Sequence, residues 1–374
     1  MGEFHEFAME RLMSTWENTV DFNLSESGVH PLTLGELVEL AGIPVDELFA
    51  IGLGYPQANG LVELRETIAA TYAGAGADNV LVTVGAAEAN YLALTTFVER
   101  GDEVVIVLPN YMQVHGIAQN VEARVRPVPL VEERGWKLDL EALERAVTPA
   151  TRLVCVCNPN NPTGRILDEE ERQAVVAAAE RAGAWLLADE VYRGAEHEGV
   201  ETPSFFGSYE RVLAQGSMSK AYGLPGLRVG WAVGPPDACE RMWRRHEYTT
   251  IATTMISNVL ARLALSPDVR PRLLARTRDY NTAGWSYLAA WAEEHDQDVR
   301  LFPPQAAAIA FGRYSARIPS LELVDRLRKE KSVLVVPGDH FGLDGCLRIS
   351  FGLPAEQLNE GLGRLGELLV ELRA

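Results

Sequence analysis

Residues 217–230 read Ser217-Met-Ser-Lys220-Ala-Tyr-Gly-Leu-Pro-Gly-Leu-Arg228-Val-Gly230. Two serines precede the lysine, and the arginine follows eight residues later in a turn rich in glycine and proline. One loop therefore carries an amine, two hydroxyls and a guanidinium, a set that suits a phosphate together with amine chemistry. Taken alone, the segment also fits a solvated Lys and Arg on a surface loop.

The chain around this loop alternates short apolar runs with helical patterns from Asn79 onward. Such alternation is typical of a mostly parallel sheet covered by helices. Strands are predicted at 80–83, 103–108, 123–127, 152–157, 184–188, 212–215 and 229–233, and helices at 87–99, 139–146 and 168–181. After about Pro267 the pattern changes to long helices and short strands at 309–311, 333–336 and 347–350, with a closing helix from Ala355. We expect a large domain at residues 45–270 and a small α/β domain made of residues 1–44 and 271–374.

Composition narrows the class of protein. The 374 residues are 47% hydrophobic and 23% charged, which excludes a disordered chain or a disulfide scaffold. With 34 Lys and Arg against 52 Asp and Glu, the net charge is −18, so nucleic acid is an unfavourable partner. No run approaches the ~20 apolar residues of a membrane span, and Met1-Gly-Glu-Phe-His-Glu-Phe7 carries acids where a signal peptide has a basic start. We expect a cytoplasmic protein with no membrane partner.

The four cysteines are at positions 155, 157, 239 and 346. Cys155 and Cys157 alternate along one predicted strand, so both should point to one face as small buried residues. Because Cys-x-Cys lacks a second close pair or a clustered His, a zinc site is disfavoured. We expect reduced thiols and no metal.

Three further segments place polar residues beside predicted strands. They are Thr83-Val-Gly85-Ala-Ala87-Glu, Asn158-Pro-Asn-Asn161-Pro-Thr-Gly164 and Ala188-Asp189-Glu-Val-Tyr192. Alone, a strand-end Asp is as consistent with a helix N-cap. Together with residues 217–230, however, these segments resemble, in order, the motifs of the fold type I pyridoxal-phosphate enzymes of the class I/II aminotransferase family. The resemblance covers about residues 24–352 and implies a mostly parallel seven-stranded sheet between helices plus a small α/β domain.

The resemblance implies pyridoxal 5'-phosphate as cofactor, bound to Lys220 as a Schiff base. Asp189 would pair with the pyridine nitrogen, which makes the ring a better electron sink. Asn161 and Tyr192 would donate to the phenolic oxygen, and Tyr111 would stack on the ring. The phosphate would be bound by the amides of Gly85, Ala86 and Ala87 with Ser217, Ser219 and Arg228. Two alanines stand where many relatives carry a hydroxyl, so one phosphate contact is expected to be lost or moved.

Two segments outside this core are matched as well. Gly54-Tyr55-Pro-Gln-Ala-Asn-Gly60 resembles the segment whose tyrosine reaches the neighbouring subunit's phosphate, which implies a homodimer with shared active sites. Cys346-Leu-Arg348-Ile-Ser350 resembles the strand whose arginine binds the substrate α-carboxylate, for which a planar guanidinium is suited. A salt bridge with a C-terminal acid is the alternative for Arg348.

The region expected over the substrate, Asn23-Leu-Ser-Glu-Ser-Gly28-Val-His30, departs from the common form and is similar to the capreomycidine synthase branch, which cyclises a hydroxylated arginine. Gly28 and His30 are therefore candidate substrate-binding residues with Asn161 and Arg348, although His30 could simply cap a turn. The ordinary Asp-Glu-Val-Tyr segment favours transamination between an L-amino acid and a 2-oxo acid. The alternatives are a cyclase, lyase or oxidase acting on an arginine-derived amino acid and, less favoured, a non-catalytic regulator. His115 stays undecided, and Arg193 is expected to face solvent rather than an acid.

Overall fold

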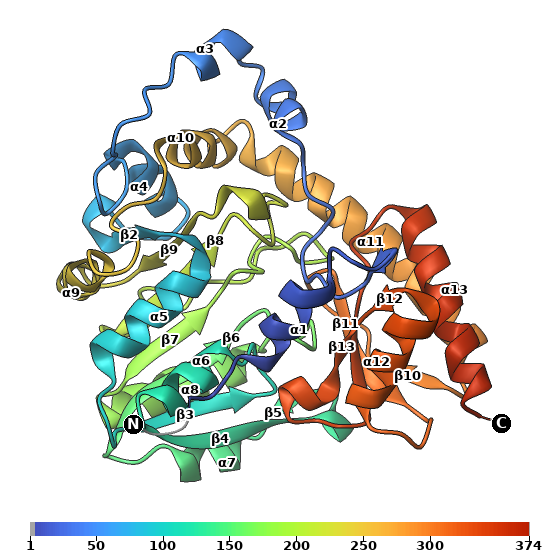
Figure 1. Cartoon of the computed structure of the whole chain (residues 1–374). Coiled ribbons are helices and arrows are strands. Elements are labelled where there is room, and N and C mark those ends of the chain that lie inside the picture. Colours follow the sequence, from blue (N-terminus) through green and yellow to red (C-terminus); the bar gives the residue numbers. More distant parts are fainter. Residues whose placement is uncertain (1–3, 374) are drawn as a thin grey trace.

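The computed structural model describes residues 4–373, so the first three residues of the acidic N-terminal segment lie outside it. In this part of the chain, eight strands form one sheet in the order β2-β9-β8-β7-β6-β3-β4-β5 (Figure 1). They are β2 (Val80–Thr83), β3 (Glu103–Leu108), β4 (Arg124–Val131), β5 (Lys137–Leu138), β6 (Thr151–Cys157), β7 (Trp185–Asp189), β8 (Val212–Ser217) and β9 (Gly230–Val233). The pairs from β4 through β3, β6 and β7 to β8 are parallel, and β9 is antiparallel to both its neighbours.

The seven strands predicted from the sequence are therefore present, with ends shifted by a few residues. The eighth, β5, has two residues and pairs antiparallel with the edge strand β4. Because two residues are too few for an apolar pattern, the sequence did not indicate this strand.

Helices cover both faces of the sheet (Figure 1). They are α4 (Val62–Ala69), α5 (Gly85–Phe97), α6 (Gln113–Asn120), α7 (Leu140–Ala146), α8 (Glu169–Ala182), α9 (Pro236–His246) and α10 (Met255–Ala264). On β3, Val105 and Val107 pack into one core while Val104 and Ile106 pack into another. A parallel strand buried on both faces needs such an unbroken apolar run, which is the pattern that predicted it.

The C-terminal third builds a second sheet, in the order β10-β11-β14-β13. Its elements are α11 (Arg270–Glu294), β10 (Val299–Leu301), β11 (Ile309–Tyr314), α12 (Ser320–Lys331), β12 (Val333–Leu334), β13 (Val336–Pro337), β14 (Cys346–Ser350) and α13 (Ala355–Glu371). The single strand predicted at 333–336 is in fact two, because β12 pairs with an N-terminal strand while β13 pairs with β14.

The first part of the N-terminal segment, as far as Val29, packs against the C-terminal third. The segment as a whole contains α1 (Ala8–Trp16), β1 (Phe22–Asn23), α2 (Leu34–Ala41) and α3 (Val45–Phe49). Strand β1 pairs with β12 in parallel, and the Ser350 amide donates to the Leu24 carbonyl over 2.9 Å. Helix α1 lies between the large sheet and the C-terminal elements (Figure 1). The division into domains at residues 45–270 and at 1–44 with 271–374 stays a prediction.

None of the described helices combines the length and apolar character needed to cross a membrane. The four cysteines are free and buried, Cys155 and Cys157 within β6.

Candidate active site

The carboxyl ends of the parallel strands meet at one edge of the large sheet, where ligands commonly bind in open α/β folds. Asp189 ends β7, Ser217 ends β8, and Asn161 follows β6. These ends open into a cavity of about 330 Å³. The predicted site residues that line it are Ala86, Ala87, Tyr111, Asn161, Asp189, Tyr192, Ser217, Ser219, Lys220, Arg228 and Arg348.

One end of the cavity offers donors for an anion. Helix α5 begins at Gly85, and the first amides of a helix have no partner within it. Gly85 has φ +75, and a Cβ there would lie 2.3 Å from Arg228 Nη2, so the guanidinium occupies the space that a side chain would take. Arg228 Nη1 donates to Ser219 Oγ over 3.3 Å. Amides, hydroxyls and a guanidinium thus converge, as the phosphate motif implied.

The cavity wall also contains a buried carboxylate. Asp189 is 5% exposed, and its Oδ1 accepts from the Val191 amide over 3.2 Å. Burial raises the pKa of Asp189 to about 6, although the Val191 amide and Asn90 act in the other direction. No ion pair to Asp189 forms within residues 4–373. A protonated ring nitrogen would supply the missing positive charge.

The middle of the cavity brings together the amine and the groups expected around it. Lys220 Nζ lies 3.5 Å from Glu26 Oε2, and Tyr192 is buried beside it in the cavity wall. Arg348 is buried, its Nη1 donates to Asn161 Oδ1 over 3.0 Å, and its Nε has no partner in the described chain. The salt bridge to a C-terminal acid, considered for Arg348, does not form there.

These residues fit pyridoxal phosphate. The anion end can hold a phosphate, the buried carboxylate can face a ring N–H, and the Asn161 amide group and Tyr192 hydroxyl can donate to a phenolic oxygen. Lys220 lines the same cavity. No group in the wall contradicts the expected cofactor.

Four of the predicted residues do not line the cavity, namely Gly28, His30, Tyr55 and Gly85. Gly28 abuts it, since a Cβ there would lie 3.6 Å from Lys220 Cδ. His30, a candidate for the substrate pocket, does not line this cavity. Its backbone is fixed by Gly352 and Arg276, and its ring stacks on Tyr280 instead. Gly85 borders the anion end through Arg228, and Tyr55 is 89% exposed.

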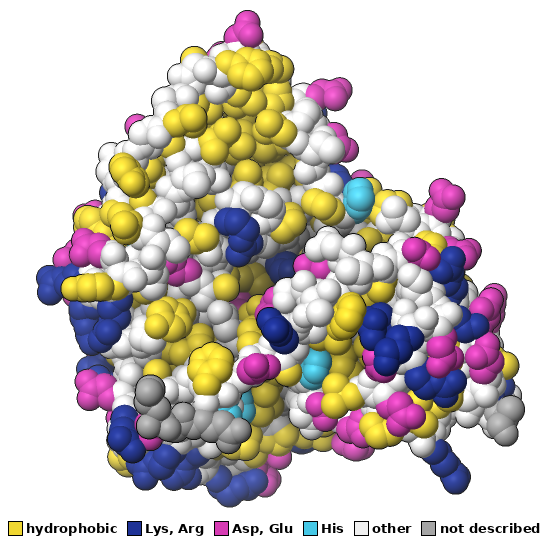
Figure 2. Space-filling model, in the orientation of Figure 1, with side chains coloured by type: hydrophobic (Ala, Val, Ile, Leu, Met, Phe, Trp, Pro, Cys, Tyr) yellow, Lys and Arg dark blue, Asp and Glu magenta, His cyan; other side chains and the backbone are white. Residues whose placement is uncertain are grey.

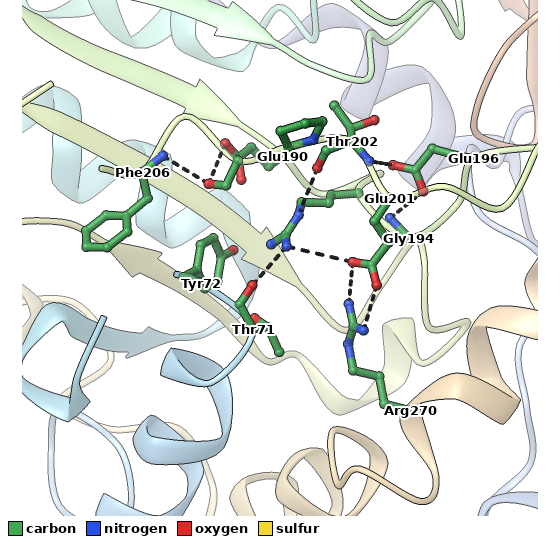
Figure 3. Close-up of polar contacts among 12 residues, drawn as sticks. Thr71, Tyr72, Glu190, Gly194, Glu196, Glu201, Thr202, Phe206 and Arg270 are labelled. Carbon is green, nitrogen blue, oxygen red and sulfur yellow. Dashed lines mark hydrogen bonds and ion pairs between the residues drawn. The ribbon is translucent and has the colours of Figure 1, made fainter. Parts of the chain in front are cut away.

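Arg193 was expected to face solvent, and this is wrong. Its guanidinium is largely buried and donates to the carbonyls of Thr202 and Thr71, with Glu201 at 3.8 Å. Figure 3 shows the network to which it belongs, in which Glu201 forms two hydrogen bonds with Arg270. This network holds the segment that follows Asp189. His115 lies partly buried on α6 outside the cavity wall, and burial lowers its pKa.

Glu190, next to Asp189 in the sequence, also belongs to this network rather than to the cavity. Its Oε1 accepts from the Phe205 amide and the Ser204 hydroxyl. Burial raises the pKa of Glu190 to about 7, against the effect of those two hydrogen bonds. The side chains of Asp189 and Glu190 thus lie in different surroundings, and of these two only Asp189 lines the cavity.

Sequence reasoning missed the front wall of the cavity, which the N-terminal segment supplies. Met9 and Met13 of α1 contact the Arg348 guanidinium through sulfur at 3.7 and 3.8 Å. Tyr111 donates to Glu10 Oε1 over 2.8 Å, which ties the same helix to the large sheet. Further wall residues without a predicted role are Phe7, Glu17, Glu26, Ser27, Asn90, Gln113, Val191 and Pro225. The spacing of Met9 and Met13 on one helical face was the available signal.

Comparison with known proteins agrees with this geometry. The family model described as aminotransferase class I and II matches residues 50–365. Capreomycidine synthase of Streptomyces vinaceus is 33% identical over 352 residues, which cover 93% of this chain and 89% of that protein.

Two solved structures are similar over their full length. A PLP-dependent aminotransferase from Streptococcus suis 89-1591 has a TM-score of 0.93 at 30% identity, covering 99% of each chain. The PLP-dependent cyclase OrfR has a TM-score of 0.90 at 28% identity, covering 100% of this chain and 99% of its own.

Proposed function

Because the chain belongs to the class I and II aminotransferase family, whose cofactor is pyridoxal phosphate, we propose that it moves the amino group of an L-amino acid to a 2-oxo acid. The observation that carries this proposal is the convergence of Lys220, Asp189 and Arg348 on one cavity. An amine, an acid for a ring nitrogen and a cation for a carboxylate are the groups that such a reaction needs.

The groups in the cavity have separate tasks. When bound, pyridoxal phosphate supplies an electron sink that stabilises negative charge at the substrate's Cα. Arg228, Ser219 and the first amides of α5 would bind the phosphate. Asp189 would keep a proton on the ring nitrogen, and the Lys220 amine would hold the cofactor.

The substrate is oriented from the other side. Arg348 binds the α-carboxylate, for which its buried Nε is free to donate. Asn161 accepts a hydrogen bond from Arg348 Nη1 and so keeps that guanidinium in place. Asn161 also lines the cavity that would hold the cofactor. Met9 and Met13 exclude water from the Arg348 side. Once the substrate's amino group has replaced Lys220 on the cofactor, the released Lys220 Nζ would be the amine in the cavity that can act as a base and move the proton at Cα.

A label-transfer experiment tests this proposal. The holoenzyme is incubated with ¹⁵N-labelled amino acids and either pyruvate or 2-oxoglutarate, and the products are measured by mass spectrometry. We expect ¹⁵N in alanine or glutamate, and none with the matched Lys220→Ala variant. Product that keeps its ¹⁵N while no label reaches either acceptor would contradict transamination.

That contrary outcome corresponds to a second candidate, a cyclase or lyase that leaves the amino group on the substrate. The similarity to capreomycidine synthase over 93% of the chain and to the cyclase OrfR supports it. Both reactions begin with removal of the same Cα proton, so the same cavity residues serve either one. Loss of a leaving group from the labelled substrate would select this candidate.

We further propose that the protein is a homodimer with shared active sites. Hydrophobic side chains gather over the part of the molecule that carries α2, α3 and α10 (Figures 1 and 2). Phe49, Leu53 and Tyr55 in this region are 81%, 86% and 89% exposed. An apolar surface of this kind favours association, and a second copy would bring Tyr55 towards its neighbour's phosphate site. Sedimentation analysis tests the dimer directly.

A further inference from the structure

The cavity contains more negative charge than the proposed reaction uses. Its charged side chains are Glu10, Glu17, Glu26, Asp189, Lys220, Arg228 and Arg348. In the proposed function Arg228 meets a phosphate, Arg348 meets a carboxylate, and Asp189 meets a ring nitrogen. Lys220 holds the cofactor. Three glutamates are left without a task, and all come from residues 10–26.

These glutamates form one acidic wall, defined as Glu10, Glu17 and Glu26. Glu10 accepts a hydrogen bond from the Tyr111 hydroxyl, and Glu26 lies 3.5 Å from Lys220 Nζ. Glu17 forms no ion pair in residues 4–373. Burial raises the pKa of Glu17, and the neighbouring Glu26 and Glu10 add to this effect. A cation bound between these acids would relieve this repulsion and favour their ionised forms.

The same cavity has a separate feature that indicates a ligand. Arg348 is 1% exposed, and its Nε has no hydrogen-bond partner among residues 4–373. A buried donor left unpaired is destabilising, so this atom calls for an acceptor that the described chain does not provide. An α-carboxylate at Arg348 would leave the rest of the substrate between Lys220 and the acidic wall. Among residues 4–373, no arginine or lysine other than Lys220, Arg228 and Arg348 lines the cavity to receive a side-chain carboxylate.

We propose that the substrate is an amino acid with a cationic side chain, bound by Glu17 and Glu26, an inference that rests on the proposed function. In the holoenzyme the Lys220 amine holds the cofactor, so Glu26 loses its present partner. The Glu26 carboxylate is then available to bind the cationic side chain. Charge-assisted hydrogen bonds to two carboxylates favour such a side chain over a neutral side chain of the same shape. Aspartate and glutamate would instead meet like charge.

Neutral isosteres give the test. Dissociation constants of the holoenzyme are measured by calorimetry for arginine against citrulline and for lysine against norleucine, with glutamate as the acidic member. We expect each basic amino acid to bind at least tenfold more tightly than its neutral counterpart, and glutamate to bind most weakly. Equal affinity within both pairs would overturn the proposal. A preference confined to the arginine pair or to the lysine pair supports it and identifies the cation as a guanidinium or an ammonium.

Variants locate the contact. Glu17→Gln is expected to lower arginine affinity at least tenfold while leaving citrulline affinity unchanged, and Glu6→Gln, an exposed acid outside the cavity, is the matched control. An equal loss for arginine and citrulline would refute the role of Glu17.

The absorbance of the bound cofactor separates the two proposals. If neutral amino acids change this absorbance and basic ones do not, the acidic wall is refuted while the proposed function stands. If no amino acid changes it, both are refuted.

Discussion

Substituting Gly85 by alanine should weaken cofactor binding through Arg228. A Cβ at this position would lie 2.3 Å from Arg228 Nη2, and the backbone has φ +75. The left-handed backbone costs an alanine about 1–2 kcal/mol, which lowers the stability of the protein with and without cofactor. The displaced guanidinium loses a charge-assisted bond to the phosphate, worth about 1.5–3 kcal/mol. That loss corresponds to a rise of roughly tenfold to hundredfold in Kd for pyridoxal phosphate.

The assay is a titration of the cofactor-free protein with pyridoxal phosphate, followed by the quenching of tryptophan fluorescence. Gly116→Ala is the matched control, because Gly116 lies in α6 with open space around its Cβ position. Its Kd should be unchanged.

The double variant Gly85→Ala with Arg228→Ala distinguishes the mechanism. If the alanine acts by displacing the guanidinium, it should add little to the effect of Arg228→Ala alone. Fully additive losses, or a wild-type Kd for Gly85→Ala, would refute this reasoning.

Three other predictions concern charge and assembly. Since burial raises the folded-state pKa of Asp189 to about 6, its ionisation destabilises the cofactor-free protein, and the cost grows as pH rises from the unfolded-state value towards 6. In urea denaturation, the free energy of unfolding of cofactor-free Asp189→Asn should therefore exceed that of wild type by up to about 3 kcal/mol at pH 8 and equal it below about pH 4. A difference that does not change with pH would contradict this. Arg348→Lys should raise KM for amino acids about tenfold or more while the absorbance of bound cofactor stays unchanged, because a lysine cannot bind the carboxylate with two parallel bonds. Mixing inactive Lys220→Ala subunits with weakly active Tyr55→Phe subunits should restore activity in hybrid dimers, whereas shared sites are disproved if the mixture is no more active than its components.

Some of the predicted residues that line the cavity lie at strand ends. Asp189 and Ser217 follow apolar runs that must be buried strands, and parallel strands bring their carboxyl ends to one edge. Once the strands are recognised, the positions of these residues follow from topology. Arg348 was identified from the family resemblance of its strand, and its position as a charge on an otherwise apolar strand weakened the salt-bridge alternative.

The residues that were missed or misplaced depend on packing between distant segments. Glu10 and Glu17 enter the cavity only because α1 packs through Met9 and Met13 against the C-terminal sheet and Tyr111. A helix of nine residues gives little periodicity from which to infer such a position. His30 turns away because the segment is anchored by Gly352 and Arg276, and neither contact is visible in local sequence.

Helix α1 has a practical consequence for anyone shortening this protein. Similarity to the family model begins only at residue 50, so trimming to the recognisable portion would delete α1 and β1 altogether. The remaining polypeptide would keep Lys220, Asp189 and Arg348 but would open Arg348 to bulk water and lose every acid of the front wall. If the acidic wall selects the substrate as proposed, exchanging this leading segment between relatives should change the preference while the sheet stays intact.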